Sequence, residues 1–179
     1  MTFISRLACI GVLALTAPVG AQPQTDRRAV DATAADIAAV LKQAPQDAAM
    51  DATVRVVDAG GYNVGVFVVN RPKGAKNSAI LHETRVTEVY HILKGSGTLV
   101  TGGTIVGPIV REPKGQSDLW MLNNVRGTAI KDGVSRRLGP GDVVVIPGYV
   151  PHWWSATDGE LSYLVIRPDP DRVLPLKEK

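Results

Sequence analysis

Short runs of apolar, mostly β-branched residues recur along the chain and are separated by Gly and Pro. The run from Val143 to Ile146 follows the turn Gly139-Pro-Gly-Asp142, is too short for a helix, and ends at Pro147. Further strands are expected at residues 54–57, 62–69, 80–84, 88–93 and 98–101, the first two forming a hairpin around Asp58-Ala-Gly-Gly61. This pattern predicts an all-β antiparallel sandwich or barrel.

One short helix is expected before the strands. Thr33-Ala-Ala-Asp36 has the form of a capping box, in which the Thr and Asp side chains accept hydrogen bonds from each other's backbone N–H groups. Ile37, Val40 and Leu41 fall on one face of the helix, and Pro45 stops it. We therefore expect residues 22–52 to form an N-terminal segment with a short helix.

The first 21 residues resemble a secretory signal. Arg6 precedes an apolar run at residues 7–15, and Val19-Gly-Ala21 offers small residues for cleavage before Gln22. Neither this run nor any later one reaches the roughly 20 apolar residues of a membrane helix. Cys9, the only cysteine, lies in the signal, and its place at the start of the apolar run disfavours a lipoprotein anchor. We expect a periplasmic or secreted protein with no membrane contact after cleavage.

The length of the chain indicates the number of domains, and its charge limits the kinds of partner that it could bind. A chain of 179 residues, 45% of them hydrophobic, suits one globular domain, which we place at residues 53–179. The net charge of +3 comes from scattered basic residues, and only 5% of the residues are aromatic, so nucleic acid is not expected as a partner. The chain has no nucleophile elbow, phosphate-binding glycine loop or nicotinamide fingerprint, which excludes hydrolase triads and nucleotide enzymes.

Two segments carry candidate chemistry, and together they resemble the paired signature of the cupin family. Residues 141–152 read Gly-Asp-Val-Val-Val-Ile-Pro-Gly-Tyr-Val-Pro-His, and residues 81–97 supply a second His and a carboxylate. The matching residues are His82, Glu88 and Gly95 in the first motif and Gly141, Pro147 and His152 in the second. The chain departs from the family pattern at Thr84, where a second His is usual, at Tyr149 for Gly, and at Ala156 for Asn.

The resemblance covers residues 53–167 and implies an antiparallel double-stranded β-helix, the cupin or jelly-roll barrel, that commonly pairs into a homodimer. It also implies that His82, Glu88 and His152 bind a divalent ion, with Fe, Mn, Ni, Cu and Zn all compatible. The alternative is a hydrogen-bonded polar cluster without an ion. A buried ionised Glu without a cation or donors costs several kcal/mol, so it needs one or the other.

Strand alternation then assigns the neighbours of these residues. If Glu88 points inward, so do Tyr90 and Ile92, while His91 points outward. Tyr90 and Tyr149 are candidate catalytic residues; packing of Tyr90 in the core and of Tyr149 in its turn are the alternatives. Residues expected to line a substrate pocket are Thr84, Ile92 and Trp154.

Residues 98–139 form an unusually long connection between the two motifs. We expect an elaborated hairpin that folds over the barrel mouth or contacts a second subunit; an ordinary long hairpin with Trp120 and Met121 in the core is the alternative.

The function expected from these features is an exported metal-dependent enzyme acting on a small oxygen-bearing organic substrate. Oxygenase chemistry is favoured over isomerase or lyase chemistry because three protein ligands leave adjacent positions on the ion open. A non-catalytic small-molecule-binding module is the main alternative, and an assembly role of the long connection is a weaker one.

Overall fold

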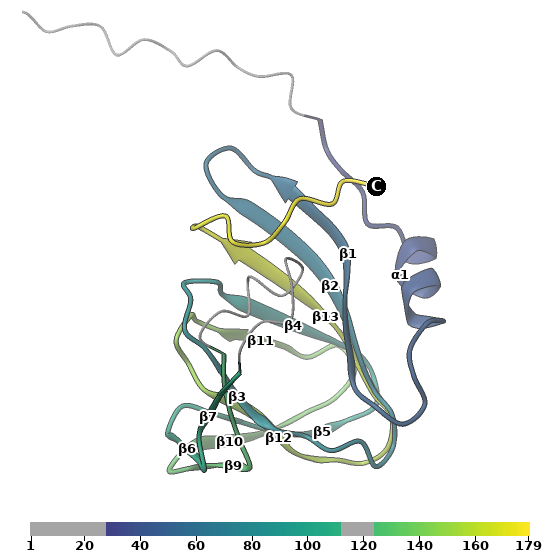
Figure 1. The fold of residues 1–179 in the computed structure, drawn as a ribbon. Coiled ribbons are helices and arrows are strands. Elements are labelled where there is room, and N and C mark those ends of the chain that lie inside the picture. Colours follow the sequence, from purple (N-terminus) through teal and green to yellow (C-terminus); the bar gives the residue numbers. More distant parts are fainter. Residues whose placement is uncertain (1–27, 112–123) are drawn as a thin grey trace, which may run out of the picture.

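The structure is a computed structural model that describes residues 28–111 and 124–179. The predicted signal with Cys9 and the residues Trp120 and Met121 lie outside the described residues. Two antiparallel sheets face each other and enclose the core (Figure 1). This arrangement confirms the predicted all-β double-stranded β-helix with a short N-terminal helix.

The first sheet has five strands and contains both long hairpin strands. In spatial order they are β1 (Met50–Asp58), β2 (Asn63–Arg71), β13 (Leu161–Asp169), β4 (Glu88–Lys94) and β11 (Val143–Ile146). The hairpin β1–β2 turns at residues 59–62, as expected. Strand β13 comes from the end of the chain and lies between β2 and β4, which places it at the centre of the sheet.

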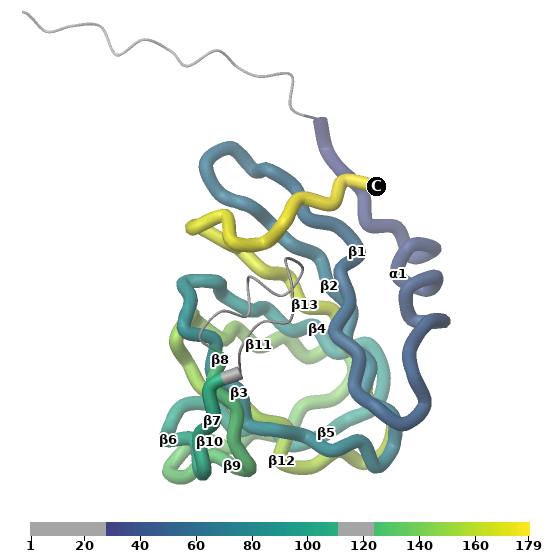
Figure 2. Tube along the Cα trace, in the orientation of Figure 1, coloured from purple at the N-terminus to yellow at the C-terminus, as the bar shows by residue number. Residues whose placement is uncertain are grey.

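The second sheet has six strands, and a two-stranded sheet extends the same end of the molecule (Figure 2). The six strands are β10 (Val134–Leu138), β5 (Gly97–Thr101), β12 (His152–Thr157), β3 (Ala79–His82), β8 (Asn124–Gly127) and β7 (Ile109–Arg111), and the pair is β6 (Thr104–Val106) with β9 (Ala129–Lys131). The pairs β6–β9 and β7–β8 are nested, so the described parts of the long connection form an extended hairpin.

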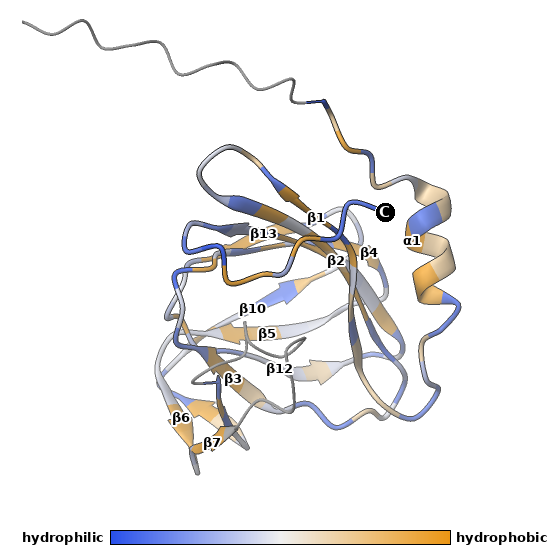
Figure 3. Cartoon of the chain, turned by 45° about the horizontal axis from the view of Figure 1, so that its top comes forward, coloured by the Kyte–Doolittle hydropathy of each residue, from blue (hydrophilic) through white to orange (hydrophobic). Residues whose placement is uncertain are grey.

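The core lies between the sheets, and hydrophobic residues recur along the strands of both (Figure 3). Strand β4 shows the expected alternation, because Glu88, Tyr90 and Ile92 are buried while His91 is exposed. Strand β3 ends at His82, two residues before the predicted end, and a bend follows in which the Val86 N–H donates to Thr84 Oγ1 at 3.4 Å.

Helix α1 (Ala34–Leu41) lies beside β1 and β2. The predicted capping box is confirmed, with Asp36 N donating to Thr33 Oγ1 at 3.2 Å and Thr33 N donating to the Asp36 carboxylate at 3.0 Å. Asp36 also pairs with Arg55 of β1 at 3.0 Å, which ties the helix to the sheet. Within residues 28–111 and 124–179, no helix has the length and apolarity to cross a membrane.

Candidate metal site

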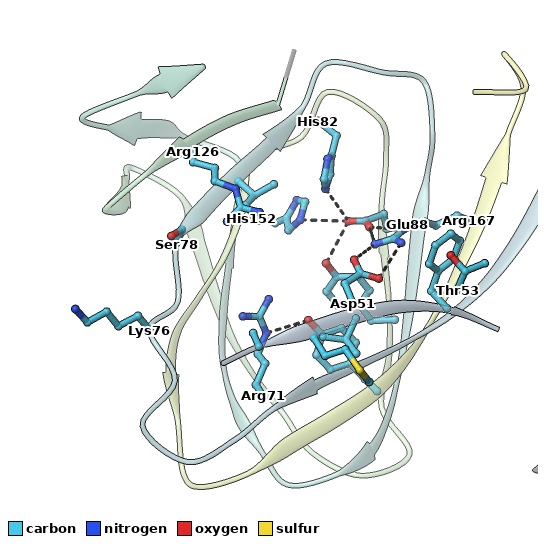
Figure 4. A pocket seen from close by; sticks show the side chains of 17 residues that line it. Asp51, Thr53, Arg71, Lys76, Ser78, His82, Glu88, Arg126, His152 and Arg167 are labelled. Carbon is cyan, nitrogen blue, oxygen red and sulfur yellow. Dashed lines mark hydrogen bonds and ion pairs between the residues drawn. The ribbon is translucent and has the colours of Figure 1, made fainter. Parts of the chain in front are cut away.

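Three side chains from different strands meet at one end of the space between the sheets. His82 is the last residue of β3, Glu88 the first of β4, and His152 the first of β12. Glu88 Oε2 lies 3.2 Å from His152 Nε2 and 3.9 Å from His82 Nε2, and one ligand-capable atom of each residue lies within 4.8 Å of the others. Figure 4 shows both imidazoles directed at the Glu88 carboxylate.

Close packing of two loops brings the imidazoles together. The turn after β11 contains Gly148, where an added Cβ would lie 2.5 Å from the Thr84 carbonyl oxygen and 2.8 Å from Arg85 Cα. Only a residue without a side chain allows the loop before β12 to sit this close to the loop after β3. Gly148 therefore has a structural reason in this chain, although the inner glycine position of the second motif is the next residue, Tyr149.

The orientation of His152 suits a metal ligand. Its Nδ1 lies 3.1 Å from the Val150 carbonyl oxygen, which can only accept a hydrogen bond. We therefore assign the ring proton to Nδ1, which leaves the lone pair of Nε2 directed at the site.

The protonation states of the other two residues follow from burial and nearby charge. Burial is the largest influence on His82 and lowers its pKa to about 3, against the opposing effect of Glu88, so the imidazole is neutral at physiological pH. Burial alone raises the pKa of Glu88, but nearby positive charge, that of Arg167 above all, together with the Arg167 hydrogen bond, outweighs burial and holds the pKa well below its ordinary value. The site thus presents a neutral imidazole at His82 and an ionised carboxylate at Glu88, the forms that bind metals.

Arg167 is the cation beside Glu88, and sequence reasoning did not identify it. It is 2% exposed, and its Nε and Nη2 lie 2.8 and 2.6 Å from Glu88 Oε1. Its Nη1 and Nη2 also donate to the Asp51 carboxylate at 3.1 and 2.6 Å, and its guanidinium lies 4.2 Å from the centre of the Phe67 ring. Period-two alternation along β13, where Leu161, Tyr163 and Val165 are buried, could have indicated an inward Arg.

Tyr90, a predicted catalytic residue, lies in direct contact with the site. Its hydroxyl donates to Glu88 Oε2 at 3.1 Å, and burial raises its pKa well above the ordinary value, so the hydroxyl keeps its proton. Tyr149, the other candidate, has a positive φ of 62°, is 58% exposed and lies on the turn before His152. It borders a small recess that His82 and His152 also line, and it does not line the main cavity.

A cavity of about 470 Å³ opens beside the three residues. Its charged and hydroxyl-bearing lining residues include Asp51, Arg71, Lys76, Ser78, Glu88, Tyr90, Arg126, Tyr163 and Arg167. The predicted pocket residues Thr84, Ile92 and Trp154 are not part of this lining.

Ile92 and Trp154 do not line the cavity because they lie too far along their strands from the candidate ligands. Ile92 and Trp154 face inward as predicted, but they belong to the buried hydrophobic core. At about 3.3 Å per residue, Ile92 is about 13 Å along β4 from Glu88, and Trp154 about 7 Å along β12 from His152. Trp154 Nε1 instead donates to the Tyr163 hydroxyl at 3.1 Å.

The three residues fit a divalent ion. Two imidazole nitrogens and one carboxylate oxygen form a set that Fe, Mn, Ni, Cu and Zn all accept. Because Arg167 engages Oε1 of Glu88, Oε2 is the oxygen directed at both imidazoles, which suits a carboxylate that binds through one atom. Thr84, which stands where the family pattern has a second His, lies in the bend after β3, where its Oγ1 accepts a hydrogen bond from Val86 N.

The family model described as Cupin matches residues 52–173. A search of curated proteins finds no match to the chain. Among solved structures, the DMSP lyase DddQ from Ruegeria pomeroyi is 21% identical with a TM-score of 0.42, and the match covers 67% of this chain and 46% of the lyase. The chain therefore spans less than half of that protein's length.

Two other similar structures have lower identity. An uncharacterized protein with a double-stranded β-helix domain from Klebsiella pneumoniae is 15% identical, with a TM-score of 0.40, and the match covers 72% of this chain and 86% of that one. Hydroxypropylphosphonic acid epoxidase from S. wedmorenis is 13% identical, with a TM-score of 0.38, and the match covers 59% of this chain and 48% of that one.

Proposed function

Because the chain belongs to the cupin family, we propose that it is an exported enzyme that binds a divalent ion through His82, Glu88 and His152 and acts on a small oxygen-bearing organic substrate. The observation that carries this proposal is the convergence of three ligand atoms within 4.8 Å at the wall of a cavity of about 470 Å³. A concave site with a few convergent polar groups is the usual form of a small-molecule site.

An ion bound at this position would supply Lewis-acid or redox chemistry at the cavity wall. The protein groups around it have separate roles. Arg167 keeps Glu88 ionised and fixes the orientation of its carboxylate, while the Val150 carbonyl fixes the His152 ring. Tyr90 places its hydroxyl at the cavity wall, and because its one proton is donated to Glu88 Oε2, the hydroxyl oxygen can accept a hydrogen bond from a substrate O–H group. We favour oxygenase chemistry over isomerase or lyase chemistry, because three protein ligands would leave adjacent positions on the ion open.

A non-catalytic binding module is the second candidate, and the Glu88–Arg167 ion pair favours it. Arg167 already compensates the buried charge of Glu88, so the carboxylate has a cation without any metal. Thr84, in place of the second His of the motif, removes one ligand from the usual family set. In this case the cavity would bind a small molecule without converting it.

Metal content separates the two candidates. We expect protein purified from its native compartment to contain about one divalent ion per chain by elemental analysis, and His152→Ala to lose it. His91→Ala is the matched control, because His91 is an exposed imidazole on β4 outside the site. Full retention of the ion in His152→Ala would refute the proposed ligand set, whereas metal-free wild-type protein with saturable small-molecule binding would support the module. Oxygen uptake during turnover distinguishes an oxygenase from an isomerase or lyase.

Export and homodimer formation are part of the same proposal. The signal-like sequence at residues 1–21 supports export, and Edman sequencing of the native protein should begin at Gln22; a native N-terminus upstream of residue 21 would contradict it.

The edge strand β11 supports pairing, because Val143 and Val145 expose 60% and 58% of their surface there. Sedimentation at micromolar concentration should give twice the mass of the chain, and a monomer would contradict the dimer.

A further inference from the structure

The described lining of the cavity carries more positive than negative side chains. Among the residues that the structure describes, the lining contains four cationic side chains, Arg71, Lys76, Arg126 and Arg167, and two carboxylates, Asp51 and Glu88. Both of these carboxylates bind the same guanidinium, that of Arg167. The cavity surface away from Arg167 is therefore positive, and a bound divalent ion would make it more so.

Arg71 is one of the remaining cations of the cavity lining. It ends strand β2, and two contacts hold its side chain in place: Nε donates to the Tyr163 hydroxyl at 3.1 Å and Nη1 to Asn77 Oδ1 at 2.8 Å. Both acceptors are neutral, and no carboxylate among the described residues forms an ion pair with Arg71. A guanidinium oriented in this way is suited to receive a planar, two-oxygen anion.

The position of Arg71 relative to the metal site follows from two tyrosines that lie between them. Tyr90 contacts Glu88 through its hydroxyl, the Tyr90 and Tyr163 ring centroids are 4.6 Å apart, and Tyr163 contacts Arg71. In Figure 4 Arg71 lies across the cavity from the two imidazoles, with Ser78 and Lys76 along one side. A substrate with one end at the ion would thus extend over the tyrosines toward Arg71.

We propose that the cavity selects a substrate with a carboxylate at the end remote from its metal-binding oxygen, and that Arg71 binds this carboxylate. Lys76 and Arg126 also line the cavity and add to its positive potential. The statement that the other end of the substrate binds the ion rests on the proposed function. The Arg71 subsite does not, because it is formed by protein groups alone.

Matched ligand pairs provide the main experiment. Isothermal titration calorimetry would compare 2-hydroxy diacids of four, five and six carbons with their distal monoamides, which are nearly identical in shape but lack the remote charge. We expect the best diacid to bind about 10- to 100-fold more tightly than its monoamide, the range for a charge-assisted hydrogen-bonded pair. Equal binding of diacid and monoamide at every length would overturn the proposal.

The variant Arg71→Gln should abolish this preference. Arg136→Gln is the matched control, because it removes the same charge from β10, outside the cavity lining, and should keep the preference. An equal loss in both variants would assign the effect to net charge and overturn the subsite. Inorganic phosphate is a separate ligand in the series, and tighter Arg71-dependent binding of phosphate than of any diacid would overturn the choice of carboxylate.

Two further measurements keep the result interpretable. Circular dichroism melting checks that Arg71→Gln folds, and if it does not, the ligand pairs on wild-type protein still decide. The titrations are repeated on chelator-treated protein, where the diacid preference should persist even if overall affinity falls. A preserved preference with no detectable metal in native protein would reject the metal site and retain the Arg71 subsite, so the two proposals fail separately.

Discussion

The substitution Arg167→Met tests how the buried charge of Glu88 is stabilised. Met has a similar length but no charge, so Glu88, 3% exposed, would lose the guanidinium at 2.6 to 2.8 Å and keep only its contacts with Tyr90 and the imidazoles. Removing one partner of a buried ion pair costs about 3 to 5 kcal/mol because the remaining charge is uncompensated. We expect a loss of that size in the free energy of unfolding of metal-free protein, measured by urea denaturation at pH 7.5.

Two comparison variants isolate the cause. Asp51→Asn removes the other partner of Arg167, but the Asp51 side chain is 35% exposed and Glu88 still pairs with Arg167, so the cost should be only about 1 kcal/mol. The double variant Arg167→Met/Glu88→Gln removes both buried charges and should be more stable than Arg167→Met alone by about 2 kcal/mol or more.

Two conditions should also reduce the loss in Arg167→Met. Without the guanidinium, burial raises the pKa of Glu88, so the folded variant takes up a proton and its deficit relative to wild type should shrink as the pH falls. A divalent ion would replace the missing positive charge, so adding Zn²⁺ should stabilise this variant more than wild type. A single variant within 1 kcal/mol of wild type, or a double variant no more stable than the single, would refute the reasoning.

Two other predictions concern the histidines. The folded-state pKa of His82, about 3, lies below its ordinary 6.5, so the unfolded chain takes up the proton first and the stability of metal-free protein should fall as the pH drops from 6.5 to 3. At about 1.4 kcal/mol per pKa unit the loss is at most about 5 kcal/mol; His82→Asn should flatten the pH profile from urea denaturation, and an unchanged slope would contradict the assignment. Gly148→Ala should push the two site loops apart and weaken Zn²⁺ binding by about tenfold or more in a competition titration. Gly159→Ala, where an added Cβ has nothing within 4 Å, should leave Zn²⁺ binding unchanged, and equal affinities of all three proteins would reject the role of the loop contact.

The sequence was sufficient to predict most of the fold and the adjacency of the three candidate ligands. Strand positions followed from β-branched runs between Gly and Pro, which is local information. The approach of His82, Glu88 and His152 was implied by two spaced motifs, and the structure brings their ligand atoms within 4.8 Å. Strand parity correctly separated the buried Tyr90 from the exposed His91.

The features of the site that the sequence did not predict depend on distances between strands that are remote in sequence. Arg167 meets Glu88 across 79 positions and Asp51 across 116, and neither pairing has a local signal. Strand alternation predicted which face of the sheet Ile92 and Trp154 occupy, but not how far they lie from the pocket along their strands. They were expected at the pocket and are found in the core. Much of the cavity wall away from the three candidate ligands comes from β1, β2 and β13, and to predict that contribution would have required the order of these strands in the sheet.

The three candidate ligands belong to opposite layers of the sandwich, with Glu88 on the five-stranded sheet and the two imidazoles on the six-stranded one. A partly folded chain in which only one layer has formed therefore has no complete chelating group. Ion capture would be a late event in maturation, following the docking of the layers. Once captured, the ion would cross-link them, so the rate of metal release would report how often the layers separate.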